Sequence, residues 1–298
     1  MMNTKLVLKR SAIFTLVILM LLLAGLGVIL RDRPAEPAAG ERVVTTGPGG
    51  ALVYHRLGQG EAVVLLPSFA RSAADFNRLA QALADAGYRS LAVQPRGIEG
   101  SAFGTLDVSL ADYAADVAAV LDAEGVATAH AVIGHAYGNR VARVFAVKHP
   151  ERVRKLVLLA AGGGKPPPPE INAAIRKAVF GFDGAAREAA IALAFFAGET
   201  VPAAWVTGWY PLAALHQTRA TTAQAYSSWS HGGSAPMLIL QPADDTAAAP
   251  ADSEKLAAQL GARATRHVIA NAGHALLPEQ PEAVASHILR YLDPPGKQ

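Results

Sequence analysis

The strongest constraint on the fold is the alternation of short apolar runs with amphipathic helical segments from residue 42 onward. Eight runs have the length and the aliphatic or β-branched composition of strands. These runs are Val43–Thr46, Leu52–Arg56, Ala62–Leu66, Arg89–Val93, His130–Ile133, Lys155–Ala160, Met237–Gln241 and Thr265–Ile269. Strands and helices that alternate in this way predict an α/β fold, with a mostly parallel twisted sheet flanked by helices.

The alternation breaks once, between about residues 164 and 233. The stretch GKPPPPE at its start continues neither a helix nor a central strand, because proline lacks the backbone donor that both require. The residues that follow are helical in pattern and include all three tryptophans: Trp205, Trp209 and Trp229. We predict an inserted helical cap here, over the carboxyl ends of the strands. The tryptophans either line a substrate pocket or form the core of the cap.

One strand leads into a helix through the sequence Gly134-His135-Ala136-Tyr137-Gly138. The spacing is that of the nucleophile elbow, G-x-S-x-G, with alanine in place of the serine. Glycine is needed on both sides because the turn is strained and the helix packs closely against the neighbouring strand. His135 is predicted to be a structural neighbour of the elbow. Ala136 occupies the nucleophile position, and its methyl group cannot attack a carbonyl.

Two later strands end in groups that could act on a substrate. The strand Met237–Gln241 is followed by Asp244 and Asp245, and the strand Thr265–Ile269 is followed by Gly273 and His274. The chain order of elbow, acid and histidine is the order found in α/β-hydrolases. Upstream, Ala62–Leu66 leads into a loop at the place where an oxyanion-hole loop is expected.

These motifs make residues 42–293 resemble the α/β-hydrolase superfamily, of the esterase, lipase and C–C-hydrolase type with a helical cap. The stretch VQPRGIEGS is similar to the loop D-x-R-G-x-G-x-S of that family, with Gln94 and Glu99 in place of its aspartate and a glycine. Pro67 and Ser68 stand where the family commonly has H-G-x. The resemblance covers nearly the whole globular part, which it predicts to adopt the α/β-hydrolase fold.

The resemblance also implies roles for single residues. His274 matches the catalytic histidine, and Asp245, rather than Asp244, matches the acid. The oxyanion hole would consist of the backbone N–H groups of Phe69 and Tyr137, which do not depend on side-chain identity. No cofactor or metal is expected. The chain has no cysteine, and the histidines His55, His130, His216 and His267 lack metal-ligand spacing.

Two interpretations of function follow from Ala136. In the first, a His274–Asp245 dyad activates water or abstracts a substrate proton, giving a serine-independent hydrolase or lyase for a small apolar ester, lactone or C–C bond substrate. In the second, the chain is a small-molecule binding protein at the membrane surface that has lost the chemistry. The first is favoured because binding alone does not require both His274 and Asp245. Less favoured are an engineered Ala136 in a serine enzyme and Ser68 as a substitute nucleophile.

The N-terminus predicts a location. Residues 1–30 contain an uncharged run, Ala12–Leu30, preceded by Lys5, Lys9 and Arg10. Its length is close to that needed to cross a bilayer, so we predict an uncleaved membrane anchor or a cleaved signal peptide, with the domain exported or secreted. Residues 31–41 are predicted to be a linker. Without the three N-terminal cations the acidic and basic residues balance, so no nucleic-acid partner is expected.

Overall fold

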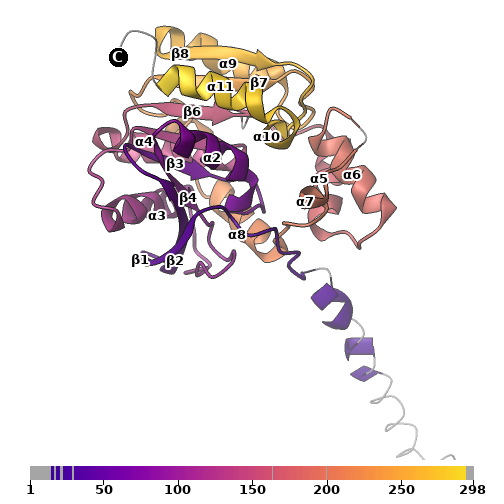
Figure 1. Cartoon of the computed structure of the whole chain (residues 1–298). Helices are drawn as coiled ribbons and strands as arrows, with labels where there is room; N and C mark the ends of the chain where they lie inside the picture. Colours follow the sequence, from indigo (N-terminus) through magenta and orange to yellow (C-terminus); the bar gives the residue numbers. More distant parts are fainter. Residues whose placement is uncertain are drawn as a thin grey trace, which may run out of the picture.

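The computed structural model describes residues 15, 16, 18–20, 23–28, 30–162, 164–198 and 200–292. Eight strands form one sheet in the order β1-β2-β4-β3-β5-β6-β7-β8 (Figure 1). β1 and β4 each pair with β2 in an antiparallel manner, and the pairs from β4 to β8 are parallel. The strands are β1 (Glu41–Gly47), β2 (Gly50–Gly58), β3 (Ala62–Leu66), β4 (Arg89–Val93), β5 (Ala131–His135), β6 (Leu156–Leu159), β7 (Met237–Pro242) and β8 (Ala264–Ile269). Each predicted run overlaps one of them, and the predicted α/β-hydrolase fold with a mostly parallel sheet is confirmed.

The central strands β3 and β6 are apolar at every position because helices cover both faces of the sheet. In β3, Val64 and Leu66 belong to the core on one face, whereas Val63 and Leu65 belong to the core on the other. All four side chains are buried. Successive side chains of a strand point to opposite faces, so one short apolar run contributes to two hydrophobic layers.

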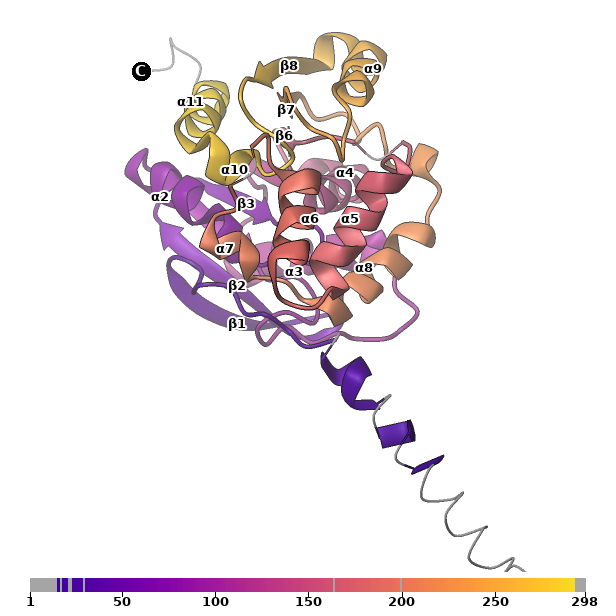
Figure 2. The same cartoon turned by 90° about the vertical axis from the view of Figure 1, so that its right-hand side faces the viewer.

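Two groups of helices supply these layers. The first face of the sheet packs against α3 (Leu110–Ala123), α4 (Tyr137–Lys148) and α9 (Pro250–Leu260). The other face packs against α2 (Asn77–Asp85), α10 (Leu276–Glu279) and α11 (Pro281–Leu292). Figure 2 shows α9 and α11 flanking the end of the sheet formed by β7 and β8. The arrangement brings the loops after β3, β5, β7 and β8 to one edge of the sheet, because these strands are parallel.

Among the described residues, four α-helices lie between β6 and β7 in the sequence, where a cap is predicted. They are α5 (Pro169–Phe180), α6 (Ala185–Phe195), α7 (Ala203–Val206) and α8 (Pro211–Thr222). Residues of all four contribute to a hydrophobic cluster of their own, which also includes Ala70 and Ala275 from the sheet side. In Figure 1, α5, α6 and α7 stand beside the layered sheet rather than on either of its faces.

The predicted N-terminal anchor falls largely on residues outside the described part of the chain. Among the residues that are described, no helix is long and apolar enough to cross a membrane. A spanning helix needs about 20 consecutive, mostly apolar residues, and the predicted location depended on such a helix. The prediction of a membrane-anchored, exported domain is therefore wrong on this finding.

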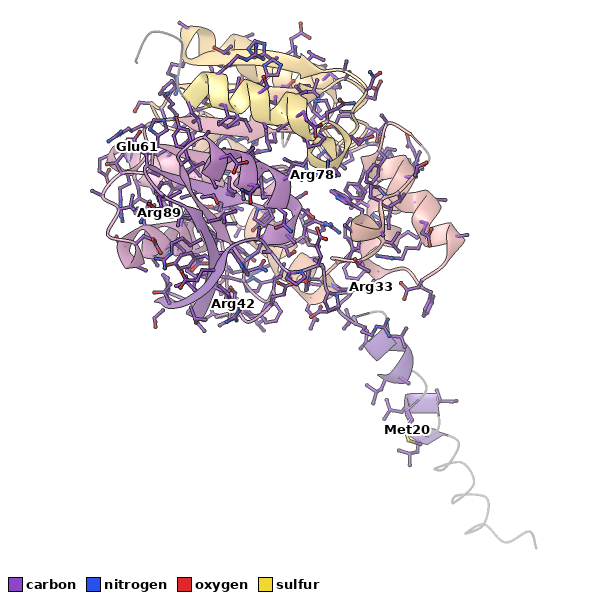
Figure 3. All side chains as sticks on the ribbon, in the orientation of Figure 1. Met20, Arg33, Arg42, Glu61, Arg78 and Arg89 are labelled. Atoms are coloured by element: carbon purple, nitrogen blue, oxygen red, sulfur yellow. The ribbon has the colours of Figure 1, made fainter. Side chains whose placement is uncertain are left out.

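The segment at residues 31–41, predicted to be a linker, makes specific contacts with the domain. Arg33 is buried, and its guanidinium donates to the carbonyl oxygens of Val179 and Gly181 and pairs with Asp183 at 2.7 Å. Its backbone forms a β-bridge with Trp209. Figure 3 labels Arg33 where the N-terminal segment meets the domain. This segment thus binds the helical region through one buried cation.

Candidate active site

The elbow has the backbone geometry that its glycines predict. Ala136 lies between β5 and α4 with φ 47° and ψ −101°, a strained conformation for a residue with a side chain. A Cβ atom on Gly134 would come closer than 3.0 Å to the backbone of Gly138. A Cβ atom on Gly138 would clash in the same way with the backbone of Leu66, in the neighbouring strand. The strained turn and the close packing thus require glycine at both flanking positions.

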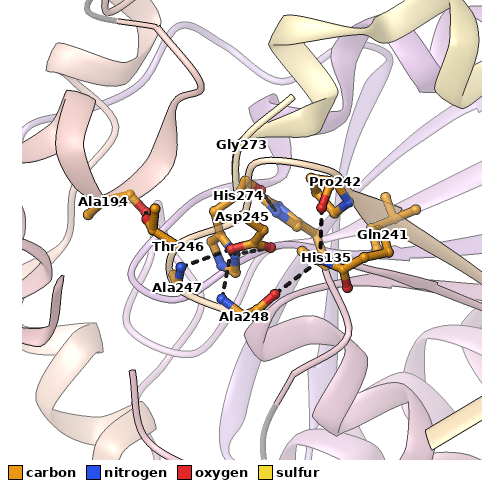
Figure 4. Close-up of polar contacts among 12 residues, drawn as sticks. His135, Ala194, Gln241, Pro242, Asp245, Thr246, Ala247, Ala248, Gly273 and His274 are labelled. Atoms are coloured by element: carbon orange, nitrogen blue, oxygen red, sulfur yellow. Dashed lines mark hydrogen bonds and ion pairs between the residues drawn. The ribbon is translucent and has the colours of Figure 1, made fainter. Parts of the chain in front are cut away.

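The loops after β7 and β8 bring His274 and Asp245 together (Figure 4). His274 Nδ1 lies 3.0 Å from both carboxylate oxygens of Asp245. Both side chains are buried. Nδ1 must carry the proton in order to donate to a carboxylate, so Nε2 is the ring nitrogen that can accept a proton. Asp244, the other candidate acid, is exposed and is not bonded to His274.

Asp245 is itself held in place by its own loop. Its Oδ1 accepts hydrogen bonds from the backbone N–H groups of Ala247, at 2.9 Å, and Ala248, at 2.7 Å. The carbonyl of Ala248 in turn accepts a bond from the side-chain amide of Gln241, a fully buried residue in β7. A carboxylate that accepts several hydrogen bonds is held in one orientation. Gln241 thus supports the acid from the strand, a role that its sequence position does not reveal.

Two further residues fix the backbone around His274. His135 donates from Nε2 to the carbonyl oxygen of His274 at 2.8 Å. Burial, followed by the nearby His274, lowers the pKa of His135 to about 3, so its imidazole is neutral. Glu279 accepts hydrogen bonds from the backbone N–H groups of Gly273 and Ala197, and burial raises its pKa. Glu279 therefore ties the loop of His274 to the end of α6.

The predicted oxyanion donors are the backbone N–H groups of Phe69 and Tyr137, and both residues line one cavity. Phe69 follows β3, and Tyr137 begins α4, where the helix dipole adds positive potential. Neither backbone N–H group has a hydrogen-bond partner within the described part of the chain. Beside Phe69, the N–H of Ala70 donates to Gln217 Oε1 at 2.7 Å, which holds the loop against α8. The two free N–H groups can therefore donate hydrogen bonds to a carbonyl oxygen of a ligand.

The substitutions in the D-x-R-G-x-G-x-S loop compensate for each other. Gln94 is fully buried; its amide group donates to Glu99 at 2.5 Å, and its Oε1 accepts the N–H of Ala73. Glu99 adopts φ 45°, as a glycine readily would. Its other carboxylate oxygen accepts the hydroxyl of Tyr210. The replaced pair thus links the segment after the oxyanion loop to the start of α8.

A cavity of about 250 Å³ lies over the elbow. Its walls include Ala136, His274 and the two oxyanion residues, together with side chains from α4, α5, α6 and α8. The other lining residues are Ser68, Arg140, Ala160, Gly162, Lys165, Pro167, Asn172, Ile175, Phe195, Thr218, Thr221, Thr222, Ala247 and Ala248. The cavity therefore joins every predicted catalytic position except the supporting acid to one space between the sheet and the helical region.

None of the three tryptophans lines this cavity. Trp205 and Trp209 are buried in the core of the helical region, where the Trp209 indole N–H donates to the carbonyl of Trp205 at 2.6 Å. The guanidinium of Arg71 lies 4.3 Å from the ring centre of Trp205. Trp229 belongs to the core on one face of the sheet. Trp205 and Trp209 thus lie in the core of the helical region, whereas Trp229 lies neither in that core nor in the cavity wall.

The family model described as the alpha/beta hydrolase fold matches residues 61–209, half of the chain, and the chain belongs to this family. It is 40% identical over 122 residues to a 2-hydroxy-6-oxononadienedioate/2-hydroxy-6-oxononatrienedioate hydrolase of Burkholderia vietnamiensis, covering 39% of this chain and 42% of that protein. It is 38% identical over 101 residues to epoxide hydrolase B of Mycobacterium tuberculosis, covering 33% and 28%. The matched segment thus spans less than half of either curated relative.

Solved structures share the fold over a larger part of the chain. An esterase from Rhodococcus sp. has a TM-score of 0.68 at 24% identity, covering 84% of this chain and 98% of that one. The naproxen esterase of Bacillus subtilis has a TM-score of 0.70 at 18% identity, covering 86% and 93%. At these identities the likeness is one of fold.

Proposed function

We propose that this protein is a hydrolase of a small ester, lactone or C–C bond substrate that uses a His274–Asp245 dyad and no serine nucleophile. The observation that carries the proposal is the hydrogen bond between His274 and Asp245, with the acid held in turn by two backbone N–H groups. A histidine oriented in this way has its Nε2 available for a proton. It lines the same cavity as Ala136.

The reaction proceeds without a covalent acyl-enzyme. A water molecule beside the methyl group of Ala136 attacks the substrate carbonyl carbon, and His274 Nε2 takes the proton that the water loses. The carbonyl oxygen becomes negatively charged and accepts hydrogen bonds from the N–H groups of Phe69 and Tyr137. The bond to the leaving group then breaks, and the imidazolium of His274 returns the proton to that group. Asp245 stabilises the imidazolium between the two steps.

The two contributions have comparable size. General-base catalysis accounts for roughly 10²- to 10⁴-fold. An oxyanion hole and substrate binding without a working triad still give roughly 10³- to 10⁴-fold over water. The relatives support hydrolysis as the reaction class, since they are named as hydrolases of a dienedioate and of epoxides.

One observation favours a second candidate, a small-molecule binding protein. The elbow carries a methyl group where an enzyme of the serine type needs a hydroxyl. Loss of the nucleophile leaves the cavity and the two N–H donors unchanged, and these suffice to bind a carbonyl compound. A binding protein would capture such a ligand without converting it.

Turnover of short acyl esters, lactones and vinylogous diketones by the full chain separates the candidates. We expect measurable hydrolysis by the native protein, loss of that activity in His274→Ala, and no loss in His267→Ala, which removes an exposed histidine that does not line the cavity. No turnover by the native protein, together with activity in Ala136→Ser, would contradict the serine-independent mechanism. Tight binding without conversion would favour the binding protein.

A further inference from the structure

One cation on the wall of the cavity has no protein partner within the described part of the chain. Arg140 is in α4, one helical turn after Ala136, and it lines the same cavity as His274. It is half-buried, and among the described residues it makes no hydrogen bond and no ion pair. A guanidinium carries five N–H donors. Leaving these donors unpaired in a cavity wall that is partly shielded from water costs free energy unless a bound molecule accepts hydrogen bonds from them.

The buried arginines elsewhere in the described chain all have protein partners, although Nη2 of Arg187 has none. They are Arg33, Arg71, Arg96, Arg143 and Arg187, and each donates to at least two protein oxygen atoms. Arg143 is the closest comparison because it follows Arg140 by three residues on the same helix. It donates to Asn139 Oδ1 at 2.7 Å and to the carbonyl of Gly162 at 3.0 Å. Arg140 is the exception on a helix that otherwise pairs its buried cation.

Among the described residues, the cavity wall contains no acid that could neutralise Arg140. Neither aspartate nor glutamate is among its lining residues, whereas Lys165 adds a second cation. Thr218 and Thr221 donate their hydroxyl protons to carbonyl oxygens of their own helix, at 2.8 and 3.0 Å. Burial lowers the pKa of Arg140, which reflects the cost of holding its charge away from water. The described wall therefore has an excess of positive charge and lacks an anion.

We propose that Arg140 binds a carboxylate group of the ligand that occupies this cavity, with Lys165 adding attraction. This inference rests on the proposed function in placing the reacting carbonyl group at Ala136, but the binding it describes does not require turnover. A carboxylate fits better than a phosphate for two reasons. A single guanidinium fork matches the two carboxylate oxygens in a bidentate pair. One half-buried arginine also balances one negative charge, and Lys165 is exposed.

The position of Arg140 relative to Ala136 also indicates how far the carboxylate of the ligand lies from its reacting carbonyl group. Four residues along an α-helix correspond to about 6 Å of rise, so the carboxylate lies away from the carbonyl group that would react at Ala136. The wall also has apolar side chains, with Ile175 and Phe195 among the lining residues. The ligand is thus an apolar chain with a reactive carbonyl at one end and a carboxylate at the other. This adds a charged group to the small apolar substrate expected from the sequence.

Calorimetric titration of the full chain tests the proposal with two pairs of probes. The pairs are monoethyl and diethyl succinate, and monoethyl and diethyl adipate, in which only the free carboxylate differs. We expect the native protein to bind one of the monoesters more tightly than its diester. In Arg140→Gln the monoester should bind roughly tenfold to hundredfold more weakly, since a charge-assisted pair is lost, while the diester stays within about twofold. Arg140→Lys should restore part of the preference.

Arg219→Gln is the matched control, because it removes an arginine of α8 that is 63% exposed and does not line the cavity. It should leave both affinities unchanged. Equal weakening of monoester and diester in Arg140→Gln would overturn the proposal, and so would a native protein that shows no preference for either monoester. Hydrolysis is measured separately on the same samples. A protein that prefers monoesters but never hydrolyses them would overturn the proposed function and leave the carboxylate site intact.

Discussion

The elbow and His274 line the same cavity, but the elbow and the His274–Asp245 pair differ in which of their parts are complete. At the elbow the backbone geometry is complete, down to the two glycines that admit the close packing, whereas the side chain at its centre is an inert methyl group. At the other site the side chains themselves are complete, and hydrogen bonds from Ala247 and Ala248 hold Asp245. A backbone turn is needed to fold the chain, but an oriented acid and base are not. This difference is the physical argument for retained chemistry.

The largest effect on turnover is expected from removing the negative charge of Asp245. Asp245→Asn should lower the turnover number by a factor on the order of 10³, because a neutral amide no longer fixes the tautomer of His274 or stabilises its imidazolium. Initial rates with the best ester substrate measure this. Asp244→Asn is the control, since Asp244 is exposed and its side chain does not bond to His274. Equal rates for the two variants would remove the distinction between the elbow and the pair.

The close backbone packing of the elbow predicts a loss of stability when one of its glycines is replaced. Gly138→Ala should lower the free energy of unfolding by about 3 kcal/mol or more, because the added methyl group meets the backbone of Leu66 in a packed strand. Gly198→Ala adds a methyl group with no described heavy atom within 4 Å, and should change stability by about 0.5 kcal/mol at most. Denaturant unfolding of both variants measures this. If Gly138→Ala were as stable as the control, the close packing of the elbow would be in doubt.

His135 belongs to the elbow and donates a hydrogen bond to the backbone of His274. Its burial predicts that the free energy of unfolding depends on pH. Unfolded imidazole takes up a proton below its ordinary pKa of 6.5, whereas folded His135 stays neutral down to about pH 3. The unfolded state is therefore favoured as the pH falls through this interval, by about 1.4 kcal/mol per pH unit for a full proton difference. His135→Gln keeps a donor for the carbonyl of His274 and removes the titrating ring.

Unfolding free energies of the native protein and of His135→Gln, measured between about pH 7 and pH 4, check this linkage. The native protein should lose stability more steeply than the variant towards low pH. Parallel pH profiles would show that the pKa of His135 is the same in the folded and the unfolded state. The buried ring would then not account for acid sensitivity near the site.

The sequence predicts those parts of the molecule that depend on local pattern. Each of the eight strands is specified by its own apolar run, and the glycines at 134 and 138 specify the elbow. The choice of Asp245 over Asp244 is consistent with the geometry, because the family pattern already encodes the loop length after β7.

Contacts between residues far apart in the chain are not predictable in the same way. Arg140 and Arg143 look alike in the sequence. Only the fold shows that the carbonyl oxygens of Gly162 and Ser230 accept hydrogen bonds from Arg143 and not from Arg140. The paired replacement of Gln94 and Glu99 is also visible only once their hydrogen bond is seen. The roles of the tryptophans depended on how the helices between β6 and β7 pack, which apolar content alone does not determine.

The smallest effect concerns the connection between the oxyanion-loop side of the site and the helical region. The Tyr210 hydroxyl donates to Glu99 and accepts the N–H of Ala35. Tyr210→Phe should therefore lower the free energy of unfolding by about 1 kcal/mol, the usual net value of a hydrogen bond. Tyr291→Phe is the matched control, since the Tyr291 hydroxyl is buried without a hydrogen-bond partner among the described residues. Its removal should leave stability unchanged or raise it, and a larger loss in Tyr291→Phe than in Tyr210→Phe would show that Glu99 does not connect the two regions.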